Sequence, residues 1–472
     1  MYDSKSPHAE EFICDEEILA TLEFAKKNKN NKELLQEILQ QAEEMKGLSY
    51  RQVALLLECD DQQVIDEIHR IAMKIKERIY GNRIVFFAPL YLANYCVNSC
   101  RYCGYHHSNC EMKRKKLSQE EIRKEVIALQ DMGHKRLALE TGEDPVNIPL
   151  EYVLDSIKTI YSIKHKNGAI RRVNVNIAAT TVENYRKLKE AGIGTYILFQ
   201  ETYHKPTYEY MHPAGPKHNY AYHTEAMDRA QQGGIDDVGI GVLYGLYDYK
   251  YDTVGMMMHI KHLEDTCGVG PHTISLPRMR FASDVNIGDY QRVPDEVFYN
   301  IVAILRCAVP YTGMIISTRE SPESREKLLK LGISQLSGGS CTGVGGYADE
   351  AQREEDNTAQ FEVNDERSLD EIMNSLCRTG YIPSFCTACY REGRTGDRFM
   401  QLAKTGQICN VCQPNALMTL KEYVIDYASE ETRRFAEELI EKEIPKIKNE
   451  KIRAKTIENL KQIEEGKRDF RF

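Results

Sequence analysis

Between about residues 83 and 345, short apolar runs alternate with longer stretches in which apolar residues recur every three or four positions. Such runs are typical of buried strands, and such stretches are typical of amphipathic helices. Eight alternations over roughly 260 residues predict a complete (β/α)8 barrel of the TIM type, because the alternative, an open doubly wound sheet, usually has fewer strands. The predicted strands are 84–92, 136–141, 173–178, 195–200, 237–243, 273–277, 313–318 and 335–337.

Helical patterns separate these strands, for example at 118–132, 150–166, 182–191 and 322–331. Ser118 and Glu121 form the pattern of a capping box at the start of the first of them. We therefore divide the chain into three domains: an N-terminal helical extension (1–82), the barrel (83–345) and a C-terminal helical appendage that carries cysteines (346–472). Within the appendage, 349–357 predicts a polar loop or lid, and 430–467 predicts a charged helix with a solvated surface.

Charge and hydropathy exclude several classes of partner. The 62 basic and 71 acidic residues give a net charge of −9, so a nucleic-acid partner is not expected. No run of eighteen apolar residues is present, and the first residues lack an apolar signal core, so we expect neither a membrane partner nor secretion. The 14 cysteines are then expected in a reducing cytoplasm, where metal ligation is favoured over disulfides.

The first group of cysteines follows the first predicted strand, at the catalytic mouth of such a barrel. Cys96, Cys100 and Cys103 have the spacing Cys-x3-Cys-x2-Cys. Three thiolates can hold three irons of a cubane and leave the fourth iron open to a small molecule. The alternative is a structural zinc site, which needs a fourth ligand; Cys110, His106 and His107 are the candidates.

This string, with Tyr102 before its last cysteine, resembles the signature of the radical S-adenosylmethionine (SAM) enzymes. The resemblance implies a [4Fe-4S] cluster whose open iron is chelated by SAM, and reductive cleavage of SAM to a 5′-deoxyadenosyl radical. Gly142 and Glu143, after the second strand, are similar to the family's motif that contacts the SAM amino group. Polar residues also end later strands, and their repetition at one face favours an active site. We expect the cofactor-binding residues to be Tyr102, Gly142, Glu143, Glu201 and Arg278.

The second group of cysteines lies in the appendage. Cys386, Cys389, Cys409 and Cys412 follow the pattern Cys-x2-Cys, nineteen residues, Cys-x2-Cys. This is the spacing of a zinc ribbon, in which all four thiolates would hold a structural ion.

The residues around this group, 385–399 and 412–417, closely resemble the C-terminal signature of the HydG maturases, and the resemblance extends over the whole chain. It implies that Cys386, Cys389 and Cys412 hold an auxiliary [4Fe-4S] cluster that carries a labile fifth iron. Cys409 departs from this three-cysteine pattern: it is either a neighbour without a ligand role, which we favour, or an alternative ligand for one iron. It also implies a histidine ligand to that iron, for which His272 is the best match. Independently, His272 starts the sixth predicted strand, so an appendage that caps the bottom of the barrel would meet it.

The resemblance implies a tyrosine lyase that cleaves L-tyrosine to p-cresol and dehydroglycine. The second product would become CO and cyanide on the auxiliary cluster, for assembly of the [FeFe]-hydrogenase active site. Small-molecule partners would be tyrosine, SAM, cysteine and iron; protein partners would be a low-potential electron donor, such as flavodoxin or ferredoxin, and the maturases HydE and HydF. At the mouth, Arg319 is expected to bind the tyrosine carboxylate bidentately, with Tyr91 as a hydrogen-bond partner.

Two other functions remain open at this point. A 2-iminoacetate synthase of the ThiH type, which serves thiamine thiazole synthesis, shares the barrel and the tyrosine cleavage but lacks the C-terminal cysteines. An iron–sulfur scaffold that stores and delivers clusters would need no SAM.

Overall fold

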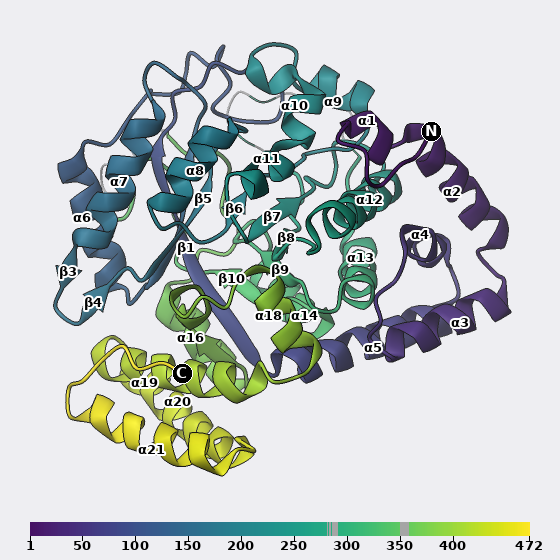
Figure 1. The fold of residues 1–472 in the computed structure, drawn as a ribbon. Helices are drawn as coiled ribbons and strands as arrows, with labels where there is room; N and C mark the ends of the chain where they lie inside the picture. The colour runs from purple at the N-terminus through teal and green to yellow at the C-terminus, as the bar shows by residue number, and fades with distance from the viewer. Residues whose placement is uncertain (281, 283–284, 286–290, 350–357) are drawn as a thin grey trace.

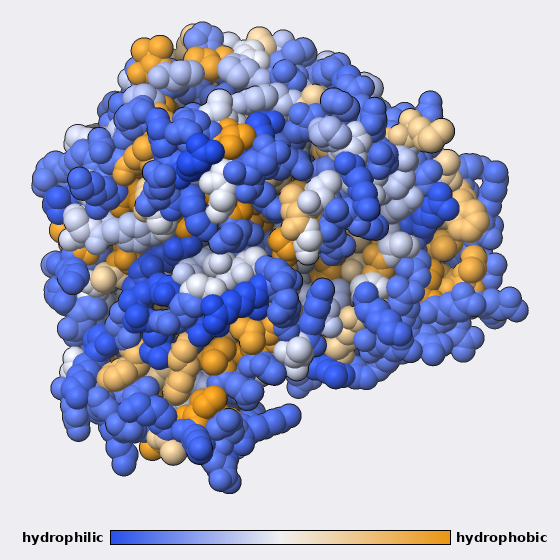
Figure 2. All heavy atoms as spheres, viewed as in Figure 1, coloured by the Kyte–Doolittle hydropathy of each residue, from blue (hydrophilic) through white to orange (hydrophobic). Residues whose placement is uncertain are grey.

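The computed structural model describes residues 1–280, 282, 285, 291–349 and 358–472, and it does not describe the side chain of Cys409 (Figure 1). Most of the predicted loop or lid at 349–357, and the role of the Cys409 thiol, therefore lie outside the described residues. In the described parts of the chain, no helix is both long and apolar enough to cross a membrane. Figure 2 shows a face in which hydrophilic residues predominate and hydrophobic ones are scattered.

The centre of the molecule is a closed barrel of eight parallel strands, which confirms the predicted fold. Strand order is β10-β9-β8-β7-β6-β5-β2-β1, and a pairing between β10 and β1 closes the ring. The strands are buried because helices cover the outside of the sheet and side chains line its lumen. Their bounds are β1 (Arg83–Ala93), β2 (Arg136–Thr141), β5 (Arg172–Asn176), β6 (Tyr196–Ile197), β7 (Val238–Gly241), β8 (Thr273–Ser275), β9 (Gly313–Ile316) and β10 (Gln335–Ser337).

The barrel helices begin where the sequence predicts them. Ser118 and Glu121 form the predicted capping box ahead of α6. One prediction is wrong in extent: α7 ends at Ser162, and the remaining residues form a hairpin, because Lys166 adopts a left-handed φ of 51° in its turn. The elements are α6 (Gln119–Asp131), α7 (Leu150–Ser162), β3 (Lys164–His165), β4 (Gly168–Ala169), α8 (Val182–Glu190), α9 (Lys205–Met211), η1 (Pro216–His218), α10 (Tyr220–Thr224), α11 (Ala226–Gln232), α12 (Tyr249–Cys267), α13 (Asp295–Ala308) and α14 (Pro322–Leu331).

The first eighty residues are helical, as the sequence predicts. Figure 1 shows these helices at the side of the barrel opposite α6 and α7. The last of them, α5, packs against α13 and α14, so it covers the outer face of the barrel's second half. Their bounds are α1 (Ala9–Phe12), α2 (Asp15–Asn28), α3 (Lys32–Glu43), α4 (Tyr50–Glu58) and α5 (Gln62–Tyr80).

The C-terminal region is helical and is tied to the barrel by a strand. Strand β11 pairs in parallel with the first residues of β1, from Arg83–Ile382 to Val85–Ser384. In Figure 1, β1 accordingly extends beyond the rest of the barrel, towards the C-terminal helices. The elements are α16 (Leu369–Arg378), β11 (Ile382–Ser384), α17 (Ala388–Arg391), α18 (Gly396–Lys404), α19 (Cys409–Asp426), α20 (Glu430–Glu443), η2 (Ile444–Lys446) and α21 (Glu450–Glu464).

The charged tail is not the single solvated helix that the sequence predicts for 430–467. It breaks at η2, where Pro445 begins a new turn, and the two resulting helices pack against α19. Their apolar positions are buried, among them Leu439, Ile440, Leu460 and Ile463. Charged residues dominate this segment, so the sequence pattern did not reveal its narrow apolar stripe.

Candidate metal centres and the cavity between them

The first cysteine group lies at the carboxyl end of the barrel strands. The loop after β1 places Cys96, Cys100 and Cys103 in the wall of one cavity at this mouth. All the predicted cofactor-binding residues except Arg278 line the same cavity. The polar and aromatic part of its wall comprises Asn98, Tyr102, Tyr105, Glu140, Glu143, Asn176, Glu201, Lys217, Tyr222, His223, Phe199, Arg319, Gln360 and Phe361, with Gly142 between them.

The donors around these thiols fit an iron–sulfur cluster. Asn98 Nδ2 donates to Cys96 Sγ at 3.7 Å, and Gln360 Nε2 donates to Cys103 Sγ at 3.6 Å. Burial raises the pKa of the Cys100 and Cys103 thiols, so a bound metal would be needed to hold both as thiolates near neutral pH. Amide donors then stabilise the sulfur charge.

The zinc alternative for this group lacks its fourth ligand. Cys110 is exposed, and its thiol lies 3.5 Å from the carbonyl oxygen of Ser108. Neither Cys110 nor His106 or His107 is among the described residues that line the cavity.

Gly142 and Glu143 hold the cysteine loop against the end of β2. A Cβ on residue 142 would lie 2.2 Å from the carbonyl oxygen of Tyr95, so only glycine allows this approach. Glu143 accepts a hydrogen bond from Asn98 Nδ2 at 2.6 Å, and its backbone oxygen accepts one from Val97 at 2.8 Å. Burial raises the pKa of the Glu143 carboxyl. This pair therefore shapes the loop as well as lining the cavity.

Glu201 and Tyr102 each have a fixed partner in the cavity wall. Glu201 pairs with Lys217 at 2.7 Å, and although burial acts to lower the pKa of Lys217, this pair raises it above its ordinary value. Glu201 also has a left-handed φ of 69°, a strained backbone that is typical of functional sites. Tyr102 Oη lies 2.8 Å from His212 Nε2. The cavity thus holds one buried ion pair beside the cysteines.

Arg278 lies outside this cavity lining. Its guanidinium contacts Glu320 through two nitrogens and Asp295 at 2.7 Å, and it lies over the ring of Phe298. This is the arrangement of a buried structural ion pair, so the geometry gives no support to its predicted role with a cofactor.

A second cavity continues from the first into the barrel lumen. The two share Glu140, Asn176, Phe199, Arg319, Gln360 and Phe361 in their walls. Tyr91 lines the deeper cavity and donates a hydrogen bond to Gln360 at 3.0 Å. Arg319 lies 3.4 Å above the Phe361 ring, and among the described residues its side chain has no hydrogen bond or ion pair. The structure therefore brings Arg319 and Tyr91 to one cavity, with the cation available to a ligand.

Sequence reasoning missed several residues of these walls. Glu140 is the penultimate residue of β2, two residues before Gly142, and burial raises the pKa of its carboxyl well above the ordinary value. An acid at the carboxyl end of a barrel strand was a signal that could have identified it. Gln360 and Phe361 follow the predicted end of the barrel, in a segment without periodicity, so no local pattern marks them.

The second cysteine group lies at the opposite end of the barrel. The N–H of Gly396 donates to Asp237 at 2.9 Å, beside the start of β7, so the segment after Cys389 contacts the amino ends of the strands. The Tyr390 ring lies 4.2 Å from the guanidinium of Arg172, and its hydroxyl lies 3.0 Å from Thr195 Oγ1. This segment closes the bottom of the barrel.

His272 faces this segment, as its position at the start of β8 predicts. Its ring lies 4.8 Å from Phe399 and 5.9 Å from Tyr390, the neighbour of Cys389. His272 Nδ1 is buried, has no hydrogen bond to any residue that the structure describes, and is 3.5 Å from Asp237 Oδ1. Burial lowers the pKa of the ring, which favours the neutral form that binds metals.

The thiols of this group are close to one another. Cys389 and Cys412 share a hydrogen bond, which raises the pKa of Cys389 and lowers that of Cys412, and Arg83 and Arg394 lower the pKa of Cys412 further. Cys386 Sγ accepts from the N–H of Ala388 at 3.4 Å, and burial raises its pKa to about 11. In the described part of the chain no three His, Cys, Asp or Glu side chains form a preformed single-ion site. The chemistry of the donors fits an iron–sulfur cluster, since three neighbouring thiols can supply thiolate ligands and Arg83 and Arg394 lie close enough to favour their charge.

Known proteins share both the sequence and the structure. Residues 90–259 match the model of the radical SAM superfamily, and residues 275–382 match that of the Biotin and Thiamin Synthesis associated domain. A crystal structure of HydG, a maturase of the [FeFe]-hydrogenase, is 59% identical, with a TM-score of 0.94 over 98% of this chain and 100% of the other. The chain belongs to the HydG family.

Two further proteins are similar to this HydG-family chain. The HydG structure from Carboxydothermus hydrogenoformans is 38% identical, with a TM-score of 0.84 over 96% of this chain and 99% of that one. The 2-iminoacetate synthase of Escherichia coli (strain K12) is 30% identical over 320 residues, which are 68% of this chain and 82% of the relative. Membership of the radical SAM superfamily implies SAM and a [4Fe-4S] cluster, and the cysteines at the barrel mouth fit that cluster.

Proposed function

We propose that this protein is a tyrosine lyase of the HydG type, which cleaves L-tyrosine to p-cresol and dehydroglycine and converts the latter to CO and cyanide for [FeFe]-hydrogenase assembly. One observation carries the proposal: two groups of three cysteines lie at opposite ends of one closed barrel, with cavities leading from the upper group into the lumen. The names of the HydG relatives support the hydrogenase role.

At the upper mouth, which is the carboxyl end of the barrel strands, the chain would bind SAM and tyrosine side by side. Cys96, Cys100 and Cys103 would hold the cluster, which with SAM supplies a 5′-deoxyadenosyl radical. The buried guanidinium of Arg319 makes no hydrogen bond or ion pair with any described residue, so it can bind the carboxylate of tyrosine bidentately. Tyr91, fixed by Gln360, lines the same space. The closed walls would exclude water from the reaction.

At the lower mouth, Cys386, Cys389 and Cys412 would hold an auxiliary [4Fe-4S] cluster, and His272 would bind a labile fifth iron. Between the mouths, the wall of the deeper cavity combines apolar side chains, such as Ile197 and Ile315, with small polar ones, such as Ser275 and Ser317. Such a lumen suits the passage of a small polar fragment from one site to the other.

A 2-iminoacetate synthase is the second candidate, because the relative from Escherichia coli shares 30% identity over 320 residues. Both functions begin with the same cleavage, so the upper mouth does not separate them. The second cysteine group distinguishes the two functions, since only the HydG-type function requires an auxiliary cluster.

The test measures p-cresol and CO in the same reaction. Replacing Cys386 and Cys389 by Ala should leave p-cresol formation largely intact and abolish CO, whereas His272→Ala should retain the auxiliary cluster and lower CO. Cys377→Ala, which removes a buried thiol of α16 outside the group, is the matched control. Wild-type CO from the double variant would favour a structural zinc ribbon instead.

A separate measurement tests the scaffold alternative. Adding SAM and a reductant to the wild-type protein should release 5′-deoxyadenosine, and the Cys96, Cys100, Cys103 triple Ala variant should release none. A protein that stores clusters without radical chemistry would give no 5′-deoxyadenosine in either case.

A further inference from the structure

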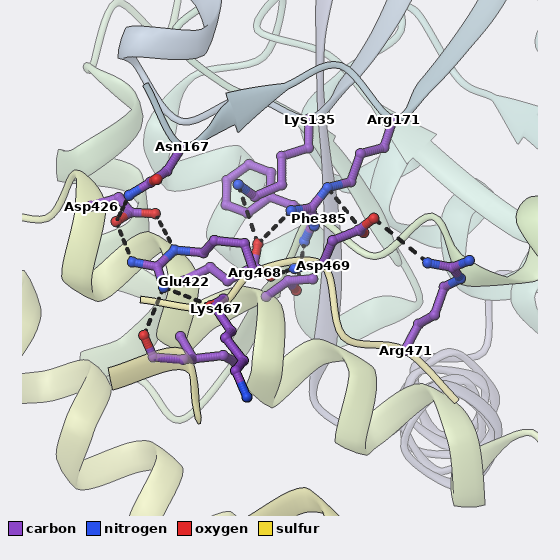
Figure 3. Close-up of polar contacts among 12 residues, drawn as sticks. Lys135, Asn167, Arg171, Phe385, Glu422, Asp426, Lys467, Arg468, Asp469 and Arg471 are labelled. Atoms are coloured by element: carbon purple, nitrogen blue, oxygen red, sulfur yellow. Dashed lines mark hydrogen bonds and ion pairs between the residues drawn. The ribbon is translucent and has the colours of Figure 1, made fainter. Parts of the chain in front are cut away.

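The last residues of the described chain, 468–472, form a tail segment that folds back beside the second cysteine group. Arg468 contacts Asp426 through two nitrogens, at 2.7 and 2.6 Å, and Arg471 contacts Glu392 at 2.6 Å. Figure 3 shows this segment between α19 and the start of the barrel strands. The tail segment therefore joins three parts of the chain: the helix of Cys412, the loop after Cys389 and the barrel.

Asp469 is the centre of these contacts. Its carboxylate lies 2.5 and 2.7 Å from the two terminal nitrogens of Arg391 and 3.3 Å from Arg171 of the barrel floor. Its N–H donates to Glu422, a fully buried residue of α19, at 2.6 Å (Figure 3). Asp469 also has a left-handed φ of 69°, which only a strongly determined environment maintains.

The final described residue holds two side chains that flank the cysteines. The N–H of Phe472 donates to Asn415 Oδ1 at 2.9 Å, and its carbonyl oxygen accepts a hydrogen bond from Arg394. Asn415 follows Cys412 by three positions on α19, so the two side chains share one helix face. The N–H of Arg394 donates to the carbonyl of Cys389 at 2.7 Å.

Each of these two side chains keeps a buried donor without an acceptor. Asn415 Nδ2 and Arg394 Nε have no hydrogen-bond partner among the described residues, although both atoms are buried and Asn415 is only 1% exposed. A buried donor without a partner is unfavourable by about 1–3 kcal/mol, so its retention calls for an acceptor in the functional protein. The sulfur atoms of an iron–sulfur cluster are such acceptors, and hydrogen bonds to them tune its potential.

We propose that Arg394 and Asn415 donate hydrogen bonds to the sulfur atoms of the auxiliary cluster, and that the tail segment holds both donors in place. This inference rests on the proposed auxiliary cluster at Cys386, Cys389 and Cys412. The positive charge of Arg394, near all three thiols, would stabilise the more negative, reduced cluster. Both residues would thereby set the potential at which the auxiliary cluster accepts an electron.

The experiment is a redox titration of the reconstituted full-length protein, followed by EPR in the presence of SAM. SAM changes the signal of the upper cluster, so the auxiliary signal can be followed separately. Arg394→Gln and Asn415→Leu should each move the auxiliary potential to more negative values. Arg394→Lys, which keeps the charge, should show a smaller shift than Arg394→Gln. The upper cluster should keep its potential in every variant.

Arg398→Gln is the matched control, because it removes the same charge from an exposed arginine of the next helix, which contacts Gly393 at 3.2 Å. It should leave the potential unchanged. A merely structural role would lower the melting temperature or the iron content without moving the potential. Should one variant fail to assemble the cluster, the other two still decide the outcome.

Failure of the proposed function and failure of this inference give different results. A wild-type protein without a second cluster, shown by iron content and EPR, overturns the proposed function and this inference together. A second cluster whose potential is the same in Arg394→Gln, Asn415→Leu and wild type overturns this inference alone.

Discussion

At the scale of single residues, the spacing of the cysteines predicts the candidate metal ligands. Cys96, Cys100 and Cys103 could be predicted as candidates because all three lie within eight positions of the sequence. Arg319 could be predicted as a charge at the end of a strand. Gln360 could not, because its place in the cavity depends on how a loop without periodicity crosses the barrel mouth.

Arg319 should be the main determinant of tyrosine affinity. Arg319→Ala removes a charged, bidentate contact worth about 1.5–3 kcal/mol, so the KM for tyrosine should rise roughly 10- to 100-fold. Steady-state p-cresol assays check this, and SAM binding, measured separately, should change little. Wild-type KM in this variant would place the tyrosine carboxylate elsewhere.

Asp252 should make stability depend on pH without any role at the metal sites. Its Oδ1 accepts hydrogen bonds from Thr202 and Tyr203 at 2.8 and 2.7 Å, and Oδ2 has no partner in the described part of the chain. Burial raises the pKa of this carboxyl from 3.8 to about 7. Between pH 3.8 and about pH 7, the Asp252 carboxyl keeps its proton in the folded protein and loses it in the unfolded chain. Stability conferred by this proton is therefore lost as pH rises through the window, by up to about 1.4 kcal/mol per pH unit.

Asp252→Asn removes this loss, so the Tm of the variant minus that of wild type should be larger at pH 8 than at pH 5. Asp155→Asn, at an exposed position of α7, is the control and should show no such difference. Thermal melts at the two pH values check this, and equal differences would assign the wild-type pH dependence to other groups.

At the scale of elements, the sequence predicts those parts of the fold whose patterns repeat. Every predicted barrel strand is present, since each is an apolar run with helices on both sides. Strand β11 escaped prediction because it has only three residues and a proline, and its partner lies about 300 positions away in the sequence. The break between α20 and α21 escaped because charge dominates both helices.

The tail segment should behave as an element that restrains α19. Asp469→Ala removes the contacts to Arg171 and Arg391, so amide exchange in residues 415–426 and 468–472 should become about tenfold faster. This change corresponds to a decrease of ~1.4 kcal/mol in the free energy of local opening. Exchange in β2 should be unaffected. Asp397→Ala, which removes an exposed acid of α18, is the control for hydrogen–deuterium exchange mass spectrometry. Unchanged exchange would show that helix packing alone holds α19.

At the scale of the whole molecule, the barrel separates the two cysteine groups, and the deeper cavity extends from the mouth of the first group into the lumen. Ser275 lies in the wall of the deeper cavity and pairs with Gly241 and Ile315 on the neighbouring strands. Large side chains here would narrow the passage without contacting either cysteine group.

Ser275→Val should therefore uncouple the two activities. The added volume lies below the tyrosine site, so p-cresol formation should stay near wild type while CO formation falls. The ratio of CO to p-cresol, measured in one reaction, checks this, and a melting curve controls for folding. An unchanged ratio would mean that the fragment reaches the lower site by another route.

The pairing of β11 with β1 also limits how such a chain can change its length over generations. Cys386 follows Ser384 by two residues, and Ser384 is fixed against Val85. One inserted codon between them would turn the cysteine to the opposite side and move it about 3.3 Å. Added codons at the turn around Gly406, where a Cβ would meet nothing within 4 Å, would disturb no such ladder. Lengths should therefore diverge among descendants at that turn and stay constant between the strand and its cysteine.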